Sequence, residues 1–360
     1  MFREKNKGIT LVALVITIVI LLILAGISIS TLTNTGIFQK AKDAKKASEN
    51  AEKEQRETLG EYEKELDQYL PAFTGKTVEE AIKHGRVLNV ENNTELYDIY
   101  GNKIVVPAGF KVTNNAKTVD KGIVIEDATT NATSGSQFVW VPVGTIYTDE
   151  NKTEDNTKKI TLGRYSFDTT TGNEGSYSGD FVEEDRGNKT LSLKKYGNEI
   201  AKNLTNFKNS AIVNGGYYIG RYEARKNSSG TITEVETDKV WNNIFQPDAA
   251  KQAQDMYKEE HNFTSDLINS YAWDTAILFI QKCTTETNYA NKTSLNIGKI
   301  AQNGTNDKTN YSGTPDVQCN IFDIASNVRE WVTETSANSS YPCVFRGGCY
   351  GDGYACYRQY

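Results

Sequence analysis

Two carboxylates near the C-terminus, Asp323 and Glu330, flank a short Ser-Asn turn. Hard cations such as Ca²⁺ take oxygen ligands from carboxylates and from backbone carbonyls. The carbonyls of the turn could complete an oxygen shell that the two side chains begin, so this turn is the best metal candidate in the sequence. In the alternative, Asp323 caps a turn and Glu330 forms an ion pair with Arg346.

A second candidate site is the stretch RGGCYGDGYACYRQY at residues 346–360. Its tyrosines are separated by Gly, Asp and Cys, as in paratopes, where rigid aromatic rings stand among adaptable polar groups. We therefore expect this stretch to bind a ligand. The expected ligand-binding residues are Cys349, Tyr350, Asp352, Tyr354, Cys356 and Tyr357.

Composition disfavours several other site chemistries. The chain has only 2 His, and His261 has no second His at ligand spacing, which argues against a zinc hydrolase or a Ser-His-Asp hydrolase. No Cys-x-x-Cys pair occurs among the 5 Cys, so neither a zinc ribbon nor a thioredoxin-like motif is indicated. The formal net charge is -6, so nucleic acid is not expected as a partner.

The N-terminal part of the chain is expected to position these sites outside a membrane. Residues 9–29 contain no charged side chain, and about 20 apolar residues span a bilayer as a helix. The basic side chains within residues 1–8 predict a cytoplasmic N-terminus and an external remainder. Residues 37–70 follow with apolar positions three and four apart, which predicts a charged amphipathic helix that serves as a stalk.

The phrase Lys7-Gly8-Ile9, followed by the apolar helix, resembles the leader of type IV pilins and pseudopilins. The resemblance implies a leader over residues 1–8 that a prepilin peptidase removes after Gly8, methylation of Ile9, and assembly with other pilins or pseudopilins. The family usually has Glu at the fifth mature position, where this chain has Ala13. An unpaired ammonium in apolar surroundings is costly, so weak polymerisation is expected.

Residues 71–136 show short alternating apolar pieces between Gly, Pro and Asn, and they predict a β-rich connecting region. Residues 77–83 predict a short helix that begins at a Thr and has an acidic first turn. The apolar run at 277–282 predicts a second helix, which packs in the core.

The region from 137 to 360 resembles the formylglycine-generating enzyme superfamily, whose fold is a variant of the C-type lectin fold. The phrases that carry the resemblance lie at residues 138–142, 216–224, 267–276, 320–331 and 345–348. It implies a lectin-like head, and the whole chain is then an α+β protein with a long N-terminal pilin-like helix, a β-rich region and this head. The family usually continues to a further closing strand, so the chain is expected to be a fragment or to lack that strand.

The resemblance also implies specific ligands. Family members bind calcium through the side chains matching Asp323 and Glu330 and the carbonyls matching Ser326 and Val328, although Ser326 stands where the family shows Gly. Copper-dependent members hold Cu(I) with two cysteines after Arg-Gly-Gly. Cys356 matches the later one if a residue is deleted, but the earlier position falls on Asp352. Copper and enzyme activity are therefore not expected.

The expected function is that of a membrane-anchored or pilus-associated surface protein whose head binds an extracellular protein or glycan. Some proteins of this fold carry a C-terminal segment diversified by retroelements, and residues 349–356 are compatible with that history. One alternative is a copper-dependent oxidase of the formylglycine-generating type. A second alternative is a minor structural pseudopilin.

Overall fold

The structure is a computed structural model. It describes residues 72–185, 200–226, 231–232, 240–260, 262–293, 315–336, 340–349 and 353–359, and scattered positions between 40 and 58. The chain divides into two compact units, Met1–Thr58 and Leu59–Tyr360. In the first unit the described residues are helical, and the predicted leader and apolar segment, with Gly8 and Ile9, lie outside them. Among the described residues, no helix is both long and apolar enough to cross a membrane.

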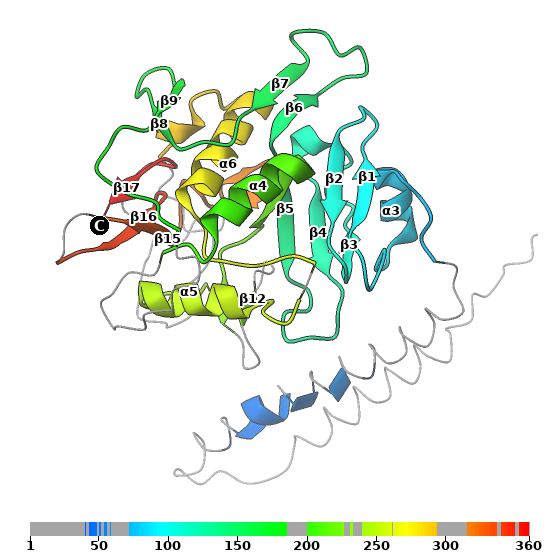
Figure 1. The fold of residues 1–360 in the computed structure, drawn as a ribbon. Helices are drawn as coiled ribbons and strands as arrows, with labels where there is room; N and C mark the ends of the chain where they lie inside the picture. Colours follow the sequence, from blue (N-terminus) through cyan, green and yellow to red (C-terminus); the bar gives the residue numbers. More distant parts are fainter. Residues whose placement is uncertain are drawn as a thin grey trace, which may run out of the picture. The chain divides into compact units, whose positions relative to one another are not determined.

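The second unit is built around a four-stranded antiparallel sheet in the order β10-β5-β4-β3, which lies at the centre of Figure 1. Of its two inner strands, β5 is apolar from Phe138 onward, whereas β4 is apolar only in its first half. The register places Val139 of β5 opposite Val124 of β4 and Ile219 of β10. The sheet thus joins two strands of the predicted connecting region, residues 71–136, to two strands of the region that begins at residue 137. Its strands are β3 (Phe110–Val112), β4 (Val124–Asp127), β5 (Gln137–Pro142) and β10 (Gly216–Gly220).

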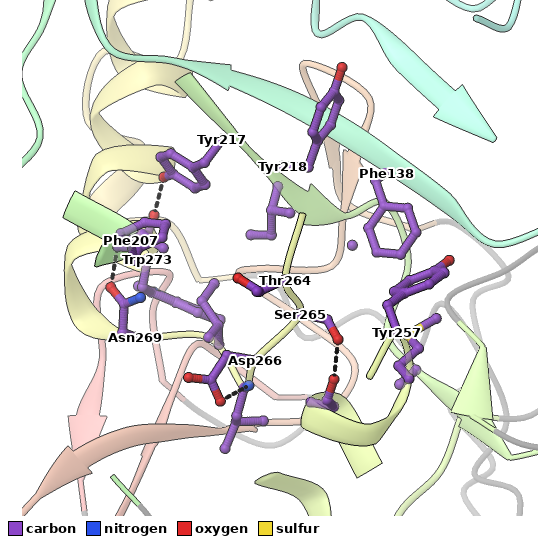
Figure 2. A pocket seen from close by; sticks show the side chains of 18 of the residues that line it. Phe138, Phe207, Tyr217, Tyr218, Tyr257, Thr264, Ser265, Asp266, Asn269 and Trp273 are labelled. Carbon is purple, nitrogen blue, oxygen red and sulfur yellow. Dashed lines mark hydrogen bonds between the residues drawn. The ribbon is translucent and has the colours of Figure 1, made fainter. Parts of the chain in front are cut away.

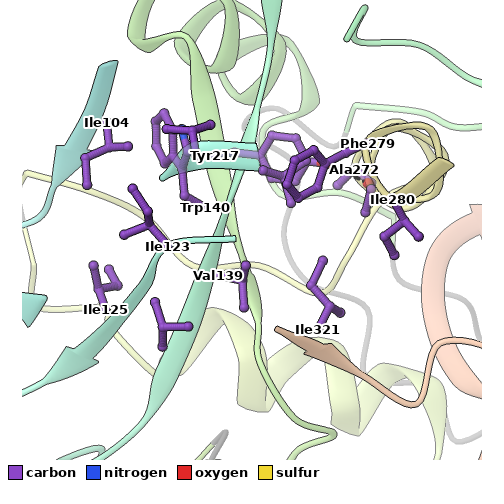
Figure 3. Close-up of a cluster of buried hydrophobic side chains, with 14 of the residues drawn as sticks. Ile104, Ile123, Ile125, Val139, Trp140, Tyr217, Ala272, Phe279, Ile280 and Ile321 are labelled. Carbon is purple, nitrogen blue, oxygen red and sulfur yellow. Dashed lines mark hydrogen bonds between the residues drawn. The ribbon is translucent and has the colours of Figure 1, made fainter. Parts of the chain in front are cut away.

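Both faces of this sheet are buried, which explains why β5 is apolar at consecutive positions. Adjacent residues of a strand point to opposite faces. Trp140 accordingly lies on the same side as Ile104 and Ile125, whereas Val139 points towards Ile321 on the other side (Figure 3).

Helix α6 (Ser270–Cys283) is the most deeply buried helix of the described part. Asn269 caps its N-terminus, since its side chain accepts a hydrogen bond from the Ala272 N–H at 3.0 Å. The run from Ala272 to Gln281 is buried throughout, so the helix is a core element with contacts on all sides. The predicted helix at 277–282 is confirmed and is longer than expected.

The predicted helix at 77–83 is confirmed as α3 (Val78–His84). Its first turn forms a capping box, in which Thr77 accepts from the Glu80 N–H and the Glu80 side chain accepts from the Thr77 N–H. The other helices are α4 (Leu204–Asn214) and α5 (Gln246–Asp255), with the 3-10 turns η1 (Val119–Lys121) and η2 (Tyr289–Asn291).

The remaining strands form small antiparallel sheets at the periphery of the second unit. Two of them, β1 and β2, lie within the predicted β-rich region at residues 71–136. These strands are β1 (Thr94–Tyr97), β2 (Lys103–Val106), β6 (Gly144–Tyr147), β7 (Thr157–Ile160), β8 (Tyr165–Phe167), β9 (Glu174–Ser176), β11 (Arg225–Lys226) and β12 (Thr231–Ile232).

The C-terminal part of the unit contains one hairpin and a three-stranded antiparallel sheet in the order β15-β16-β17. The described residues thus combine helices with many short antiparallel strands, and the predicted α+β, β-rich class is confirmed. The strands of this part are β13 (Val317–Gln318), β14 (Ile321–Phe322), β15 (Glu330–Thr335), β16 (Cys343–Arg346) and β17 (Arg358–Gln359).

Candidate ligand-binding site

The predicted metal turn connects β14 to β15. Asp323 adopts a left-handed backbone conformation (φ 61°), and its Oδ1 accepts hydrogen bonds from the Ser326 hydroxyl at 2.6 Å and the Asp316 N–H at 3.0 Å. Asp323 therefore caps a turn, as one alternative predicted. The other half of that alternative is wrong, because the Arg346 guanidinium forms its ion pairs with Asp274 and Glu334.

The sequence reasoning missed a third carboxyl group at this turn, that of Glu223. Its Oε1 accepts from the Val328 N–H at 3.1 Å, and its Oε2 accepts from the Asn327 side chain. Its carboxyl group also lies close enough to that of Glu330 for each to affect the pKa of the other. Glu223 lies in a phrase that carried the family resemblance, but nothing local in the sequence indicates its partner.

Glu223 and Glu330 form a buried pair of carboxyl groups. Burial, followed by the charge of Asp323, raises the pKa of Glu223 well above its usual range. Burial, followed by the charge of Glu223, does the same for Glu330. A raised pKa favours the protonated form of a carboxyl group, and a cation bound between the two groups would oppose that shift.

The Arg-Gly-Gly segment lies directly against this turn. A Cβ atom on Gly347 (φ +85°) would stand 2.8 Å from the Glu330 Oε2 and 2.8 Å from the Ile324 carbonyl. A Cβ on Gly348 would come within 2.3 Å of the Ala325 carbonyl oxygen. Only glycine permits so close an approach of the two backbones.

The turn is chemically suited to a hard cation. The Glu330 Oε2 is buried and has no hydrogen-bond partner among the described residues. A bound Ca²⁺ would compensate the carboxyl charges, with Asp323, Glu330 and the carbonyls of Ser326 and Val328 as its ligands. Within the described part, no group of three His, Cys, Asp or Glu side chains is arranged to hold a metal ion. The Ca²⁺ ligands named above do not require such a group, because they are two side-chain carboxylates and two backbone carbonyls.

Arg346 of the same segment belongs to a buried cluster of charged side chains. The Glu334 carboxylate accepts from Arg164, from Arg346 at 3.2 Å and from Arg358 at 2.9 Å. Asp274 pairs with Arg346 and, at 2.9 Å, with Arg358. Burial acts to raise the pKa of Glu334, but the three arginines outweigh it and lower that pKa.

A further acidic group, Glu183, lies next to this cluster. It accepts hydrogen bonds from the Ser270 N–H at 2.7 Å and from the Thr333 hydroxyl at 2.6 Å. Burial raises the pKa of Glu183 to about 7, and the nearby charge of Glu334 adds to the shift.

Four aromatic side chains and one arginine form a continuous row on the three-stranded sheet. The Trp331 and Phe345 rings lie 6.0 Å apart, and the Arg329 guanidinium lies 4.9 Å from Phe345 and 5.2 Å from Tyr357. Tyr357 contacts Tyr354 edge to face at 5.7 Å. Tyr354 is 44% exposed at the open end of this aromatic row.

The other end of the aromatic row borders a cavity of about 920 Å³, a size suited to a small ligand. Arg329 and Trp331 line the cavity together with every residue of β10. Figure 2 shows the rings of Phe138, Tyr257 and Trp273 around it. All four tryptophans of the chain belong to the lining, namely Trp140, Trp241, Trp273 and Trp331.

Besides the Glu330 Oε2, two polar atoms of aromatic side chains in the lining are buried and have no hydrogen-bond partner among the described residues. They are the indole Nε1 of Trp140 and the hydroxyl of Tyr218. The two rings pack edge to face at 5.0 Å. Since buried donors are normally satisfied, an occupant that presents oxygen acceptors here would complete the site.

The structure brings together part of the predicted ligand-binding set. Tyr354 and Tyr357 belong to the aromatic row, whereas Tyr350 and Asp352 lie outside the described residues. Cys349 is half-buried. The Cys356 N–H donates to the Ala290 carbonyl at 2.9 Å, so this cysteine anchors the segment from within the fold.

The five cysteines are all described, and none of them forms a disulfide. Burial raises the pKa of the Cys356 thiol, although the neighbouring Arg346 acts in the opposite direction. A raised pKa favours the thiol over the thiolate that would hold Cu(I).

No protein-family model, curated protein or solved structure matches the chain.

Proposed function

We propose that the chain is a surface protein whose C-terminal part binds an extracellular glycan or protein. The observation that carries the proposal is the aromatic row, which leads from the exposed Tyr354 to the cavity beside β10. Aromatic rings give a ligand a large contact area at low entropic cost, and contacts of this kind dominate many binding interfaces.

The rigidity of the sheet beneath the aromatic row also favours binding. The aromatic row lies on a sheet whose strands are joined by buried ion pairs of Arg346 and Arg358 with Asp274 and Glu334. Side chains held in place before binding lose less entropy when a ligand arrives. In this proposal calcium at the Asp323 turn contributes further rigidity.

The N-terminal segment completes the proposal. Residues 9–29 anchor the chain in the membrane after a prepilin peptidase has acted at Gly8, and the head stands outside the cell, alone or among other pilins. The charge and apolar pattern of the sequence supports this arrangement.

The test uses the purified full-length chain in detergent micelles and two probes, a glycan array and an array of extracellular proteins. A bound glycan or protein should then change tryptophan fluorescence in a titration, because all four tryptophans line the cavity. Tyr354→Ala should weaken the interaction by about tenfold or more, as expected for an aromatic anchor.

The matched control is Tyr97→Ala. Tyr97 is 39% exposed, close to the 44% of Tyr354, but it lies on β1 in another sheet. Its replacement should leave affinity within about twofold, since energetically important contacts are few and clustered. Equal losses in the two variants, or no binding on either array, would refute the proposed site.

A further inference from the structure

Two cysteines far apart in the sequence lie at a common surface hollow. Cys283 is the last residue of α6, and Cys319 is at the tip of the β13–β14 hairpin. Both line a hollow of about 380 Å³ that also includes Asp120 and Lys121 of η1. Both thiols are half-buried, so a small reagent can reach them.

The hairpin tip is fixed firmly against η1. The Asn320 side chain donates to the Lys121 carbonyl at 3.1 Å and to the Gly122 carbonyl at 2.9 Å. A Cβ on Gly122 would stand 1.8 Å from the Cys319 carbonyl oxygen, so the two backbones are in direct contact. The Cys319 Sγ lies 3.6 Å from the Asp120 carbonyl oxygen.

The backbone at Cys319 is unusual for a cysteine. Cys319 (φ 47°) and Asn320 (φ 63°) are both left-handed, as in a two-residue hairpin turn. Such turns strongly favour Asn, Asp and Gly, and a cysteine at the first position carries a conformational cost. The position thus points to a role for the side chain.

We infer that Cys283 and Cys319 are a disulfide site, which in its oxidised form ties the end of α6 to the β13–β14 hairpin. The inference does not depend on the proposed binding function. It is based on the hollow that both cysteines line, on the hydrogen bonds that fix the hairpin tip and on the unfavourable left-handed backbone conformation at Cys319.

The chemistry is thiol–disulfide exchange with a small disulfide such as oxidised glutathione. One cysteine thiolate attacks glutathione disulfide, forms a mixed disulfide and releases one glutathione. The second cysteine then attacks the protein sulfur of that mixed disulfide and releases the other glutathione. The two protein thiols are oxidised, the glutathione disulfide is reduced, and the two thiol protons end on the two released glutathiones.

The surroundings make this exchange slow at neutral pH. Burial, with the charge of Asp120, raises the pKa of Cys283 to about 12. Burial, followed by the charge of Cys283, also raises the pKa of Cys319. Because only the thiolate attacks, the rate of oxidation should rise steadily between about pH 7 and about pH 9.

The test incubates the folded full-length chain with oxidised glutathione, alkylates the remaining thiols and maps the peptides by mass spectrometry. The expected product is one cross-linked peptide pair that contains Cys283 and Cys319. The oxidised protein should melt on the order of 5 °C higher than the reduced one, and dithiothreitol should reverse the shift.

Single variants identify the partners. Cys283→Ser and Cys319→Ser should each abolish the link, whereas Cys343→Ser, which removes another half-buried thiol, should leave it intact. The inference is overturned if both cysteines of the oxidised wild type are recovered alkylated, or linked to other partners. A link that forms only after unfolding in urea overturns it as well.

Discussion

Replacing Glu334 by Gln should destabilise the fold by about 3–5 kcal/mol at neutral pH, the cost of leaving buried charges unpaired. Glu334 is fully buried, and its carboxylate is the common partner of Arg164, Arg346 and Arg358. In the variant, Asp274 is the one described carboxylate left to Arg346 and Arg358, and Arg164 retains its hydrogen bond to the Phe181 carbonyl.

The magnitude is electrostatic, because glutamine matches glutamate in size and leaves no cavity. The Arg346 side chain is fully buried and that of Arg358 is 9% exposed, so solvent screens neither charge well. The amide group can accept from one arginine but directs its NH₂ towards another. Loss of a charge-assisted hydrogen bond and repulsion among the guanidinium groups therefore act together.

Urea denaturation followed by circular dichroism measures the effect, and acid should reduce it. The pKa of Glu334 is lowered in the folded state, so its stabilisation is present above the unfolded value of 4.5 and is lost as the pH falls through the lowered value. The gap between wild type and variant should hence be largest near pH 7 and should shrink below about pH 4.

The control is Glu95→Gln, which removes the exposed ion pair with Lys103 at 3.5 Å. A surface pair of this kind contributes at most about 1 kcal/mol. If Glu334→Gln costs no more than Glu95→Gln at pH 7, or if its cost does not change with pH, the buried cluster does not stabilise the fold in the way described.

Three further perturbations test other parts of the structure. Glu183→Gln should flatten the pH dependence of stability by up to about 3 kcal/mol in urea denaturation, because a pKa raised from 4.5 to about 7 makes wild-type stability fall as the pH rises through that window. Calorimetric titration should show that Ca²⁺ affinity rises with pH above 4.5, because a carboxyl group with a raised pKa must release its proton to bind the ion. Glu330→Gln should bind Ca²⁺ about tenfold more weakly. An affinity that depends neither on pH nor on this residue would exclude the site. Ile277→Ala in the core should cost about 2–5 kcal/mol, whereas Ile212→Ala, at a residue that is 62% exposed, should have little effect on thermal unfolding.

The local elements were predictable because their signals lie within a few residues. The Thr77 capping box marks the beginning of α3, and the apolar run at 277–282 falls inside α6. The same holds for the Asp323 turn, whose polar groups bond to each other over three positions. Caps, periodicity and turns are short-range, so the sequence alone reveals them.

The composition of the site was visible in the sequence, but its geometry was not. The tyrosines after Arg-Gly-Gly indicated an aromatic surface, and Tyr354 and Tyr357 do contact each other. One alternative paired Arg346 with Glu330, and that pairing was wrong. Glu330 does lie opposite Arg346 in the strand register, but the Arg346 guanidinium reaches Glu334 and Asp274. Strand register follows from periodicity, whereas the direction of a long side chain follows from packing.

The sequence by itself determined the class of the fold, the positions of several helices and strands and the residue types at the candidate site. Only the tertiary structure placed Glu223 beside Glu330, opened a cavity beside β10 and brought Cys283 and Cys319 to one hollow. The two glutamates and the two cysteines are each far apart in the sequence. No local pattern of hydrophobicity or turn chemistry encodes which distant segment a side chain contacts. That choice is made when the whole core packs, since it depends on how all the buried surfaces fit together.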